Sequence, residues 1–121
     1  MTRRILTVDD DTQLRDLICL YFEEKGFAIS AASDASDAMA KVASDQPDVV
    51  ILDINLGKDD GLKLLSRIKE HSPQIRVVMM TGFGYDDELL REALQRGADG
   101  YVGKALPMEE LLGSVNRVLQ A

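Results

Sequence analysis

The stretch that decides the fold is Ile5-Leu6-Thr7-Val8-Asp9-Asp10-Asp11, an apolar run that ends abruptly in three acids. A short continuous apolar run with polar residues after it is typical of a strand buried on both faces. Beyond the acids, apolar side chains recur three and four positions apart, which is the spacing of one helix face. The stretch therefore predicts a buried strand followed by an amphipathic helix, which starts at Asp11 or Thr12 and ends at Gly26.

The same strand-and-helix unit recurs along the whole chain. Apolar runs predict four more strands, over residues 27–31, 49–52, 75–80 and 101–102. Apolar residues at helical spacing follow each of them, over residues 35–43, 64–68, 89–94 and 111–119. Five strand–helix pairs with short links predict an α/β fold, a doubly wound parallel sheet of five strands with helices on both faces. The 121 residues have the length of one compact domain, so we expect a single domain over residues 1–121.

Composition excludes several classes of function. Lys and Arg number 14 and Asp and Glu number 21, so the formal net charge is −7. An acidic domain is a poor non-specific binder of nucleic acid or of anionic membranes, and we expect it to bind neither. The longest apolar runs are far too short to cross a bilayer, and residues 1–5 lack the apolar region of a signal peptide. We therefore expect a cytoplasmic location.

Polar side chains follow four of the five predicted strands. In chain order these residues are Asp9 and Asp10, then Asp53 with Asn55 two positions on, then Thr81, then Lys104. The carboxyl ends of parallel strands meet at one edge of a sheet, where ligands bind at a switch in strand order. We therefore expect these side chains to lie close together. The second strand ends without a comparable group, which favours an outer position for it.

The chemistry of this set points to a metal and a phosphate. Three carboxylates in one place repel each other unless something positive is shared between them. Oxygen ligands open to water suit a hard divalent ion, so Mg²⁺ or Mn²⁺ is the expected cofactor. Lys104 can neutralise a phosphate, or pair with Asp53 when none is present, and the hydroxyl of Thr81 can donate to a phosphoryl oxygen.

Over essentially its whole length the chain resembles the receiver domain of two-component response regulators. The resemblance rests on four motifs in the expected order: Ile5-Leu6-Thr7-Val8-Asp9-Asp10, Asp53-Ile54-Asn55-Leu56 followed by Asp60-Gly61, Met80-Thr81-Gly82, and Gly97-Ala98-Asp99-Gly100-Tyr101 leading to Lys104. It implies a CheY-like (βα)5 flavodoxin-like three-layer sandwich that forms a single receiver domain.

The resemblance also implies a role for each polar residue. It makes Asp53 the phosphoacceptor, with Lys104 and Thr81 in contact with the phosphoryl group. The implied ligands of Mg²⁺ are Asp9, Asp10, Asp53 and the backbone carbonyl of Asn55. Tyr101 is similar to the aromatic switch residue of the family, whose ring turns inward as Thr81 moves toward the phosphate.

The implied function is Mg²⁺-dependent transfer of a phosphoryl group to Asp53 from a phosphohistidine of a sensor histidine kinase or phosphotransfer protein. Phosphorylation then switches the surface formed by residues 89–94, 101–102 and 111–119, which would address a downstream output domain or target protein. The same surface is expected to support a phosphorylation-dependent homodimer. Such a domain is a signalling switch that assists its own phosphorylation and dephosphorylation and is not a turnover enzyme.

Three positions bear on how this site works. Receivers usually carry Pro where this chain has Gly57, so we expect a more mobile loop and a modest effect on metal affinity. The family commonly has a cis Lys-Pro pair where this chain has Lys104-Ala105, and we expect a trans bond because a non-proline cis bond costs roughly 2.5–4 kcal/mol. Phe83 could shield the phosphoryl group from water, so we expect slow dephosphorylation.

Other functions remain open on the sequence. A pseudo-receiver that only binds a protein partner is consistent with Gly57 and Ala105. A Mg²⁺-dependent aspartyl phosphohydrolase superficially matches Asp9-Asp10-Asp11, but no cap domain fits in this length. A nucleotide- or flavin-binding domain would need a first loop rich in Gly or Ser, where this chain has acids.

Overall fold

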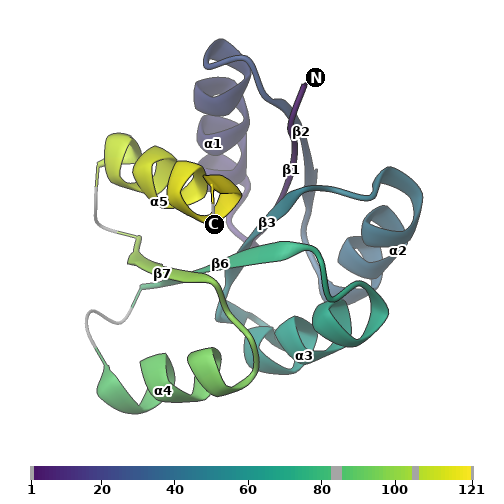
Figure 1. The fold of residues 1–121 in the computed structure, drawn as a ribbon, viewed down its shortest axis with the longest axis vertical. Coiled ribbons are helices and arrows are strands. Elements are labelled where there is room, and N and C mark those ends of the chain that lie inside the picture. Colours follow the sequence, from purple (N-terminus) through teal and green to yellow (C-terminus); the bar gives the residue numbers. More distant parts are fainter. Residues whose placement is uncertain (1, 83–85, 105–106, 121) are drawn as a thin grey trace.

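The centre of the molecule is a parallel sheet, shown in Figure 1. The computed structural model describes residues 2–82, 86–104 and 107–120. The sheet strands are β1 (Arg4–Val8), β2 (Ala28–Ala32), β3 (Val49–Asp53), β6 (Arg76–Thr81) and β7 (Gly100–Gly103). Their order is β2-β1-β3-β6-β7, and every neighbouring pair is parallel. The predicted five-stranded sheet is thus confirmed, with β2 at an outer position as expected.

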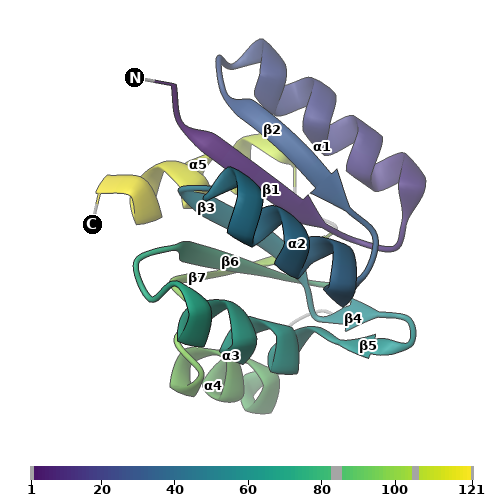
Figure 2. The ribbon, with the colours of Figure 1, turned by 90° about the vertical axis from the view of Figure 1, so that its right-hand side faces the viewer.

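In the part of the chain that the structure describes, five helices cover the two faces of this sheet. They are α1 (Thr12–Glu24), α2 (Ala35–Asp45), α3 (Gly61–His71), α4 (Asp87–Gln95) and α5 (Met108–Gln120). α1 and α5 pack on one face around Ile18, Phe22 and Val115, whereas α2, α3 and α4 pack on the other (Figures 1 and 2). The all-buried β3 lies between the two cores, which explains why its sequence reads as one apolar run. The three-layer arrangement is therefore confirmed.

Aspartate side chains start four of these helices. Asp11 accepts a hydrogen bond from the Leu14 N–H at 3.2 Å, and Asp34, Asp60 and Asp86 cap α2, α3 and α4 in the same way. A carboxylate at this position satisfies a free N–H and complements the positive end of the helix dipole. Part of the acidic charge of the chain therefore serves to begin helices. Among the described residues, no helix has both the length and the apolar character needed to cross a membrane.

Between β3 and α3 the chain forms a small hairpin that the sequence analysis did not predict. β4 (Asn55–Leu56) pairs antiparallel with β5 (Asp59–Asp60), and Gly57 and Lys58 make the turn. Gly57 has a φ of +73°, which fits a type II′ turn, in which only the first central residue has a positive φ. The carboxylate of Asp59 accepts the Ala35 N–H at 2.9 Å, so the hairpin is tied to the start of α2.

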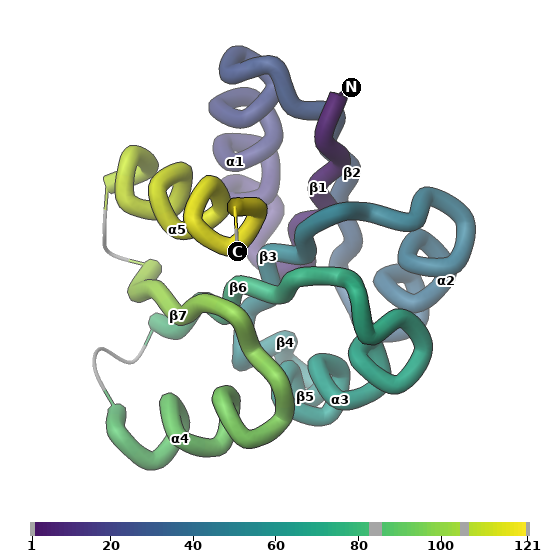
Figure 3. Tube along the Cα trace, viewed as in Figure 1, coloured from purple at the N-terminus to yellow at the C-terminus, as the bar shows by residue number. Residues whose placement is uncertain are grey.

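The strand order positions the site. The chain runs from β1 outward to β2, then returns to the other side of β1 to form β3, as the trace in Figure 3 shows. The direction of travel along the sheet therefore reverses between β1 and β3. The register pairs Val8 with Leu52, so the residues that follow each strand emerge side by side at the carboxyl edge. That reversal is where ligands bind in sheets of this kind.

Candidate functional site

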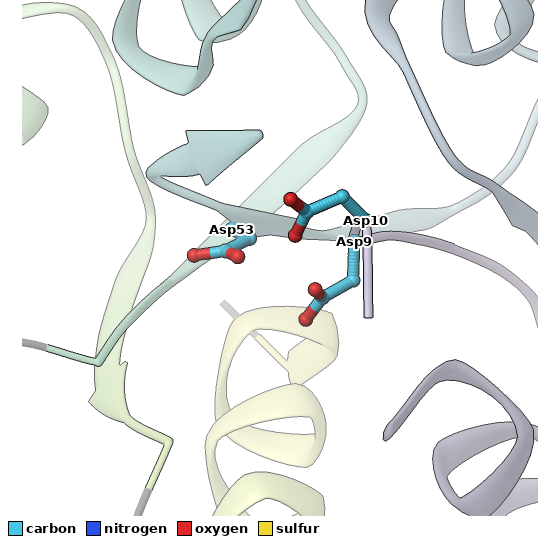
Figure 4. Close-up of side chains that lie close together, drawn as sticks. All are labelled: Asp9, Asp10 and Asp53. Carbon is cyan, nitrogen blue, oxygen red and sulfur yellow. The ribbon is translucent and has the colours of Figure 1, made fainter. Parts of the chain in front are cut away.

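Three carboxylates meet where β1 and β3 end, as Figure 4 shows. Asp9, Asp10 and Asp53 each offer one oxygen, and these oxygens all lie within 4.8 Å of one another. Asp9 is 0% exposed and Asp53 is 2% exposed, whereas Asp10 faces solvent. Two of the three acids have therefore lost most of their hydration, so their charges need compensation from the protein or from a bound cation.

Lys104 provides that compensation from the end of β7. Its Nζ lies 2.7 Å from Oδ2 of Asp53 and 3.2 Å from Oδ2 of Asp9. Its backbone N–H donates to the carbonyl of Thr81 at 2.8 Å, which joins the ends of β6 and β7. One ammonium group thus contacts both buried carboxylates, and the sequence analysis gave its pairing with Asp53 as one of its two roles.

The ionisation of Asp53 and Lys104 reflects this crowding. Burial raises the pKa of Asp53, and the charge of Asp9 adds to the rise, whereas the hydrogen bond from Lys104 offsets part of it. Burial by itself lowers the pKa of Lys104, but the hydrogen bond and charge of Asp53, together with Asp9, outweigh it and raise that pKa. Lys104 therefore stays charged, whereas the ionised form of Asp53 is destabilised relative to a carboxylate in water.

Backbone contacts fix the two buried acids. The Asp9 N–H donates to the carbonyl of Ala32 at 3.1 Å, and Oδ1 of Asp9 accepts the Asp11 N–H at 2.9 Å. Oδ1 of Asp53 accepts the Asn55 N–H at 3.2 Å. Gly61 lies so close that a Cβ there would stand 2.2 Å from the carbonyl oxygen of Asp53. Only glycine fits at this start of α3, which holds the helix against the segment that carries Asp53.

The acid cluster fits a hard divalent cation. Its donors are carboxylate oxygens, and one of the three acids is open to water, as Mg²⁺ requires if it is to keep part of its hydration shell. Oδ2 of Asp9 is buried and accepts no hydrogen bond from a described residue, although the Lys104 ammonium lies 3.2 Å away. A buried carboxylate oxygen with unused acceptor capacity, on an acid that clusters with two others, is the arrangement a metal would complete.

The remaining predicted site residues lie around this cluster. Thr81 is 2% exposed at the end of β6. Tyr101 is half-buried and packs against the core under α2, α3 and α4, so its ring lies outside the acid cluster. The predictions that concern Phe83 and the Lys104-Ala105 bond fall on residues outside the described ranges. The sequence analysis missed Arg15, whose Nη1 donates to the Asp9 carbonyl at 2.8 Å.

Comparison with known proteins gives the family. The sequence matches the model of the response regulator receiver domain over residues 5–116. The chain belongs to this family. Receiver domains are signalling domains, generally not turnover enzymes, and they generally bind Mg²⁺. The resemblance drawn from the four motifs is thus confirmed.

Named relatives support the same assignment. The phosphate regulon transcriptional regulatory protein PhoB of Escherichia coli is 32% identical over 99% of this chain and 53% of its own length. The nitrogen assimilation regulatory protein NtrX of Azorhizobium caulinodans is 34% identical over 99% of this chain and 27% of its own. The receiver thus spans about half of PhoB and about a quarter of NtrX.

Solved structures agree. A CheY-like receiver domain from Methanospirillum hungatei superposes with a TM-score of 0.93 at 29% identity, covering 99% of this chain and 95% of that one. The receiver domain of NtrX from Brucella abortus gives 0.90 at 35% identity, covering 97% and 98%. The fold of this receiver is therefore the CheY-like flavodoxin fold.

Gly57 stands where receivers usually carry Pro, and both its φ and its N–H hydrogen bond are impossible for proline. The φ of +73° at Gly57 is closed to proline, whose ring holds φ near −65°. The Gly57 N–H donates to Oδ1 of Asn55 at 3.1 Å, and proline has no N–H to donate. A Cβ on Gly57 would lie 3.3 Å from Oδ2 of Asp10, so the turn passes directly beside this acid. The expected mobility of the loop stays a prediction.

The raised pKa of Asp53 gives a testable pH dependence. The folded chain binds the Asp53 proton more readily than the unfolded chain does, so without Mg²⁺ the free energy of unfolding falls as pH rises from about 3.9, the ordinary carboxyl value, through the raised pKa. Asp53→Asn removes this loss. We expect the variant to be more stable than wild type at neutral pH and the difference to shrink below about pH 3.9. Urea unfolding in chelator over a pH series measures it.

Asp16→Asn, a change of the same charge at an exposed position on α1, is the control and should not show the gain in stability at neutral pH that is expected of Asp53→Asn. An Asp53→Asn variant that is less stable than wild type at neutral pH would contradict the account, because the ion pair with Lys104 would then outweigh burial and the repulsion from Asp9.

Gly57→Pro should lower the free energy of unfolding by about 1–3 kcal/mol, because the turn must leave its left-handed φ and lose the hydrogen bond to Asn55. Gly57→Ala should lower the free energy of unfolding by about 1 kcal/mol, because alanine disfavours a positive φ. The matched control is Gly113→Ala on α5, where a Cβ would meet only Nη1 of Arg117 at 3.6 Å and stability should hold or rise. Urea unfolding measures all three. A Gly57→Pro variant as stable as wild type would show that this turn does not need its positive φ.

Proposed function

We propose that Asp53 is the phosphoacceptor of this receiver and takes its phosphoryl group from a phosphohistidine of a sensor histidine kinase or phosphotransfer protein. The observation that carries the proposal is the position of Asp53. Its oxygen lies within 4.8 Å of oxygens of Asp9 and Asp10, and it makes the shorter contact with the Lys104 ammonium, at 2.7 Å against 3.2 Å for Asp9. A carboxylate in such a place is a competent nucleophile whose product lies among groups able to bind it.

In the proposed step an oxygen of Asp53 bonds to phosphorus as the P–N bond to the donor imidazole breaks. The imidazole nitrogen keeps the electron pair of the broken bond and takes up a proton from solvent, while Asp53 becomes an acyl phosphate. Such a transfer needs positioning and charge neutralisation more than covalent chemistry. Lys104 would move its ammonium from the carboxylate of Asp53 to a phosphoryl oxygen, and the hydroxyl of Thr81 would donate to another.

The metal of this site would be held by Asp9, Asp10 and Asp53, with the backbone carbonyl of Asn55 as a further ligand. Mg²⁺ is the expected ion and Mn²⁺ an acceptable substitute, because both prefer oxygen ligands. When bound, the ion supplies positive charge that neutralises the phosphoryl oxygens during transfer. Asp9 and Asp10 would hold that charge beside Asp53. The buried Asp9 would be a fixed ligand, and the exposed Asp10 a ligand that faces solvent.

Phosphorylation would act on the rest of the chain through Thr81 and Tyr101. An acyl phosphate adds negative charge beside Lys104 and Thr81, at the ends of β7 and β6. Tyr101 lies on β7 against the face that carries α4, so its half-buried ring can report a shift at the end of β6 to the surface of α4, β7 and α5. That surface would address an output domain or target, or a second copy of the chain. A cytoplasmic location follows from partners of this kind.

The assembled acid cluster favours a working receiver over a pseudo-receiver. A protein that only binds a partner has no need of two buried carboxylates that share one ammonium group. No contact of the described residues favours a phosphohydrolase that turns over. Assistance of its own phosphorylation and dephosphorylation belongs to the proposal, with Lys104 as the assisting group.

Intact mass spectrometry tests the proposal. The chain is incubated with acetyl phosphate, with Mg²⁺ or with chelator. We expect one added phosphoryl group that requires Mg²⁺ and is lost in Asp53→Asn. The matched control, Asp16→Asn, should be labelled as wild type is, because Asp16 lies exposed on α1. Labelling of Asp53→Asn to the wild-type level would refute Asp53 as the acceptor. Absence of any adduct, repeated with a phosphohistidine donor, would refute phosphoacceptance and favour the pseudo-receiver.

A further inference from the structure

Arg15 makes a contact that its place on α1 does not require. The sheet ladder at the end of β1 closes with the Asp9 N–H, which donates to the carbonyl of Ala32 at 3.1 Å. Beyond that bond the carbonyl of Asp9 has left the ladder, and it accepts a hydrogen bond from Nη1 of Arg15 at 2.8 Å. A short bond from a charged donor is among the stronger hydrogen bonds in proteins. The half-buried side chain of Arg15 thus provides the hydrogen bond that the sheet no longer gives to this carbonyl.

The peptide group held in this way is the one that joins Asp9 to Asp10. The carboxylate of Asp10 is exposed, accepts no hydrogen bond from a described residue and lies beside the turn at Gly57, so its backbone sets the position from which it can reach the cluster. Asp9, in contrast, is fixed by its own burial and by the Asp11 N–H and Lys104. The bond from Arg15 is therefore the side-chain contact from α1 that fixes the peptide before Asp10, while the Asp11 N–H bond to Asp9 holds the peptide after it.

We propose that Arg15 is a positioning residue for the cation site: by holding the Asp9–Asp10 peptide it places the carboxylate of Asp10 for metal binding. This inference rests on the proposed function, because it takes Asp10 to be a metal ligand. Groups that hold a metal ligand in place without touching the metal typically contribute about tenfold or more to metal affinity.

Electrostatics alone gives the opposite expectation. Arg15 carries a positive charge next to a site for a cation, so its removal should strengthen Mg²⁺ binding if charge were its only contribution. A positioning role requires that removal weaken binding, because Asp10 would lose its orientation. The sign of the change in Mg²⁺ affinity therefore separates the two explanations.

The experiment is a titration of the full chain with Mg²⁺, followed through the backbone amide signals of the first loop in ¹H–¹⁵N NMR spectra. We expect Arg15→Ala to bind Mg²⁺ about tenfold more weakly than wild type. Arg15→Lys keeps the charge and one donor, so it should recover part of that loss. The control is Arg67→Ala, which removes the same charge from an exposed position on α3 and should leave affinity unchanged or slightly stronger.

A second readout needs no metal. The carbonyl ¹³C signal of Asp9 should move in Arg15→Ala, because its oxygen loses a hydrogen bond, and should stay near its wild-type position in Arg67→Ala. If Arg15→Ala proves too unstable to study, Arg15→Lys alone decides, since a positioning role still requires measurably weaker Mg²⁺ binding than wild type.

Asp10→Asn separates failure of this inference from failure of the site itself. If wild type binds no Mg²⁺, or if Asp10→Asn binds it as tightly as wild type does, the proposed metal site is wrong. If Asp10→Asn binds more weakly while both Arg15 variants bind as tightly as wild type or more tightly, the site stands and the positioning role of Arg15 is overturned.

Discussion

Two buried carboxylates share one ammonium group, and the carboxyl edge of the sheet is built around that constraint. Asp9 and Asp53 lie at the ends of adjacent strands with little exposure, and Lys104 contacts both. In isolation either buried acid would be expensive to ionise, and together they repel each other. The arrangement therefore leaves the site short of positive charge. That shortage favours a cation, and under the proposed function the bound cation would supply the positive charge that a phosphoryl group requires.

The strand order brings these three charged side chains together. Asp9 comes from β1, Asp53 from β3, and Lys104 from the end of β7 on the far side of β6. A sheet that reverses direction between β1 and β3 brings the two acids together, and the bond from the Lys104 N–H to Thr81 anchors the lysine above the end of β6. The apolar strands form the core and also position the site. They set the distances among charges that lie far apart in the sequence.

The sequence predicted the elements whose pattern is long and periodic. The apolar runs of β1, β3 and β6 and the amphipathic helices carry their own signal, and the acids at the strand ends follow from topology. The hairpin of β4 and β5 was missed because two-residue strands show no periodicity, although the glycine of Gly57-Lys58 is a turn signal. Gly61 and Arg15 act through close approach and through the reach of a long side chain, which spacing along a helix does not encode.

The central claim is tested most directly by a crystal structure of the chain with Mg²⁺ and beryllium fluoride, a tetrahedral mimic of a phosphoryl group. The account predicts the fluoride adduct on the carboxylate of Asp53, the metal among Asp9, Asp10 and Asp53, and the Lys104 ammonium moved onto a fluorine. An adduct on another residue, or Lys104 still paired with a free Asp53 at saturating Mg²⁺ and fluoride, would contradict it.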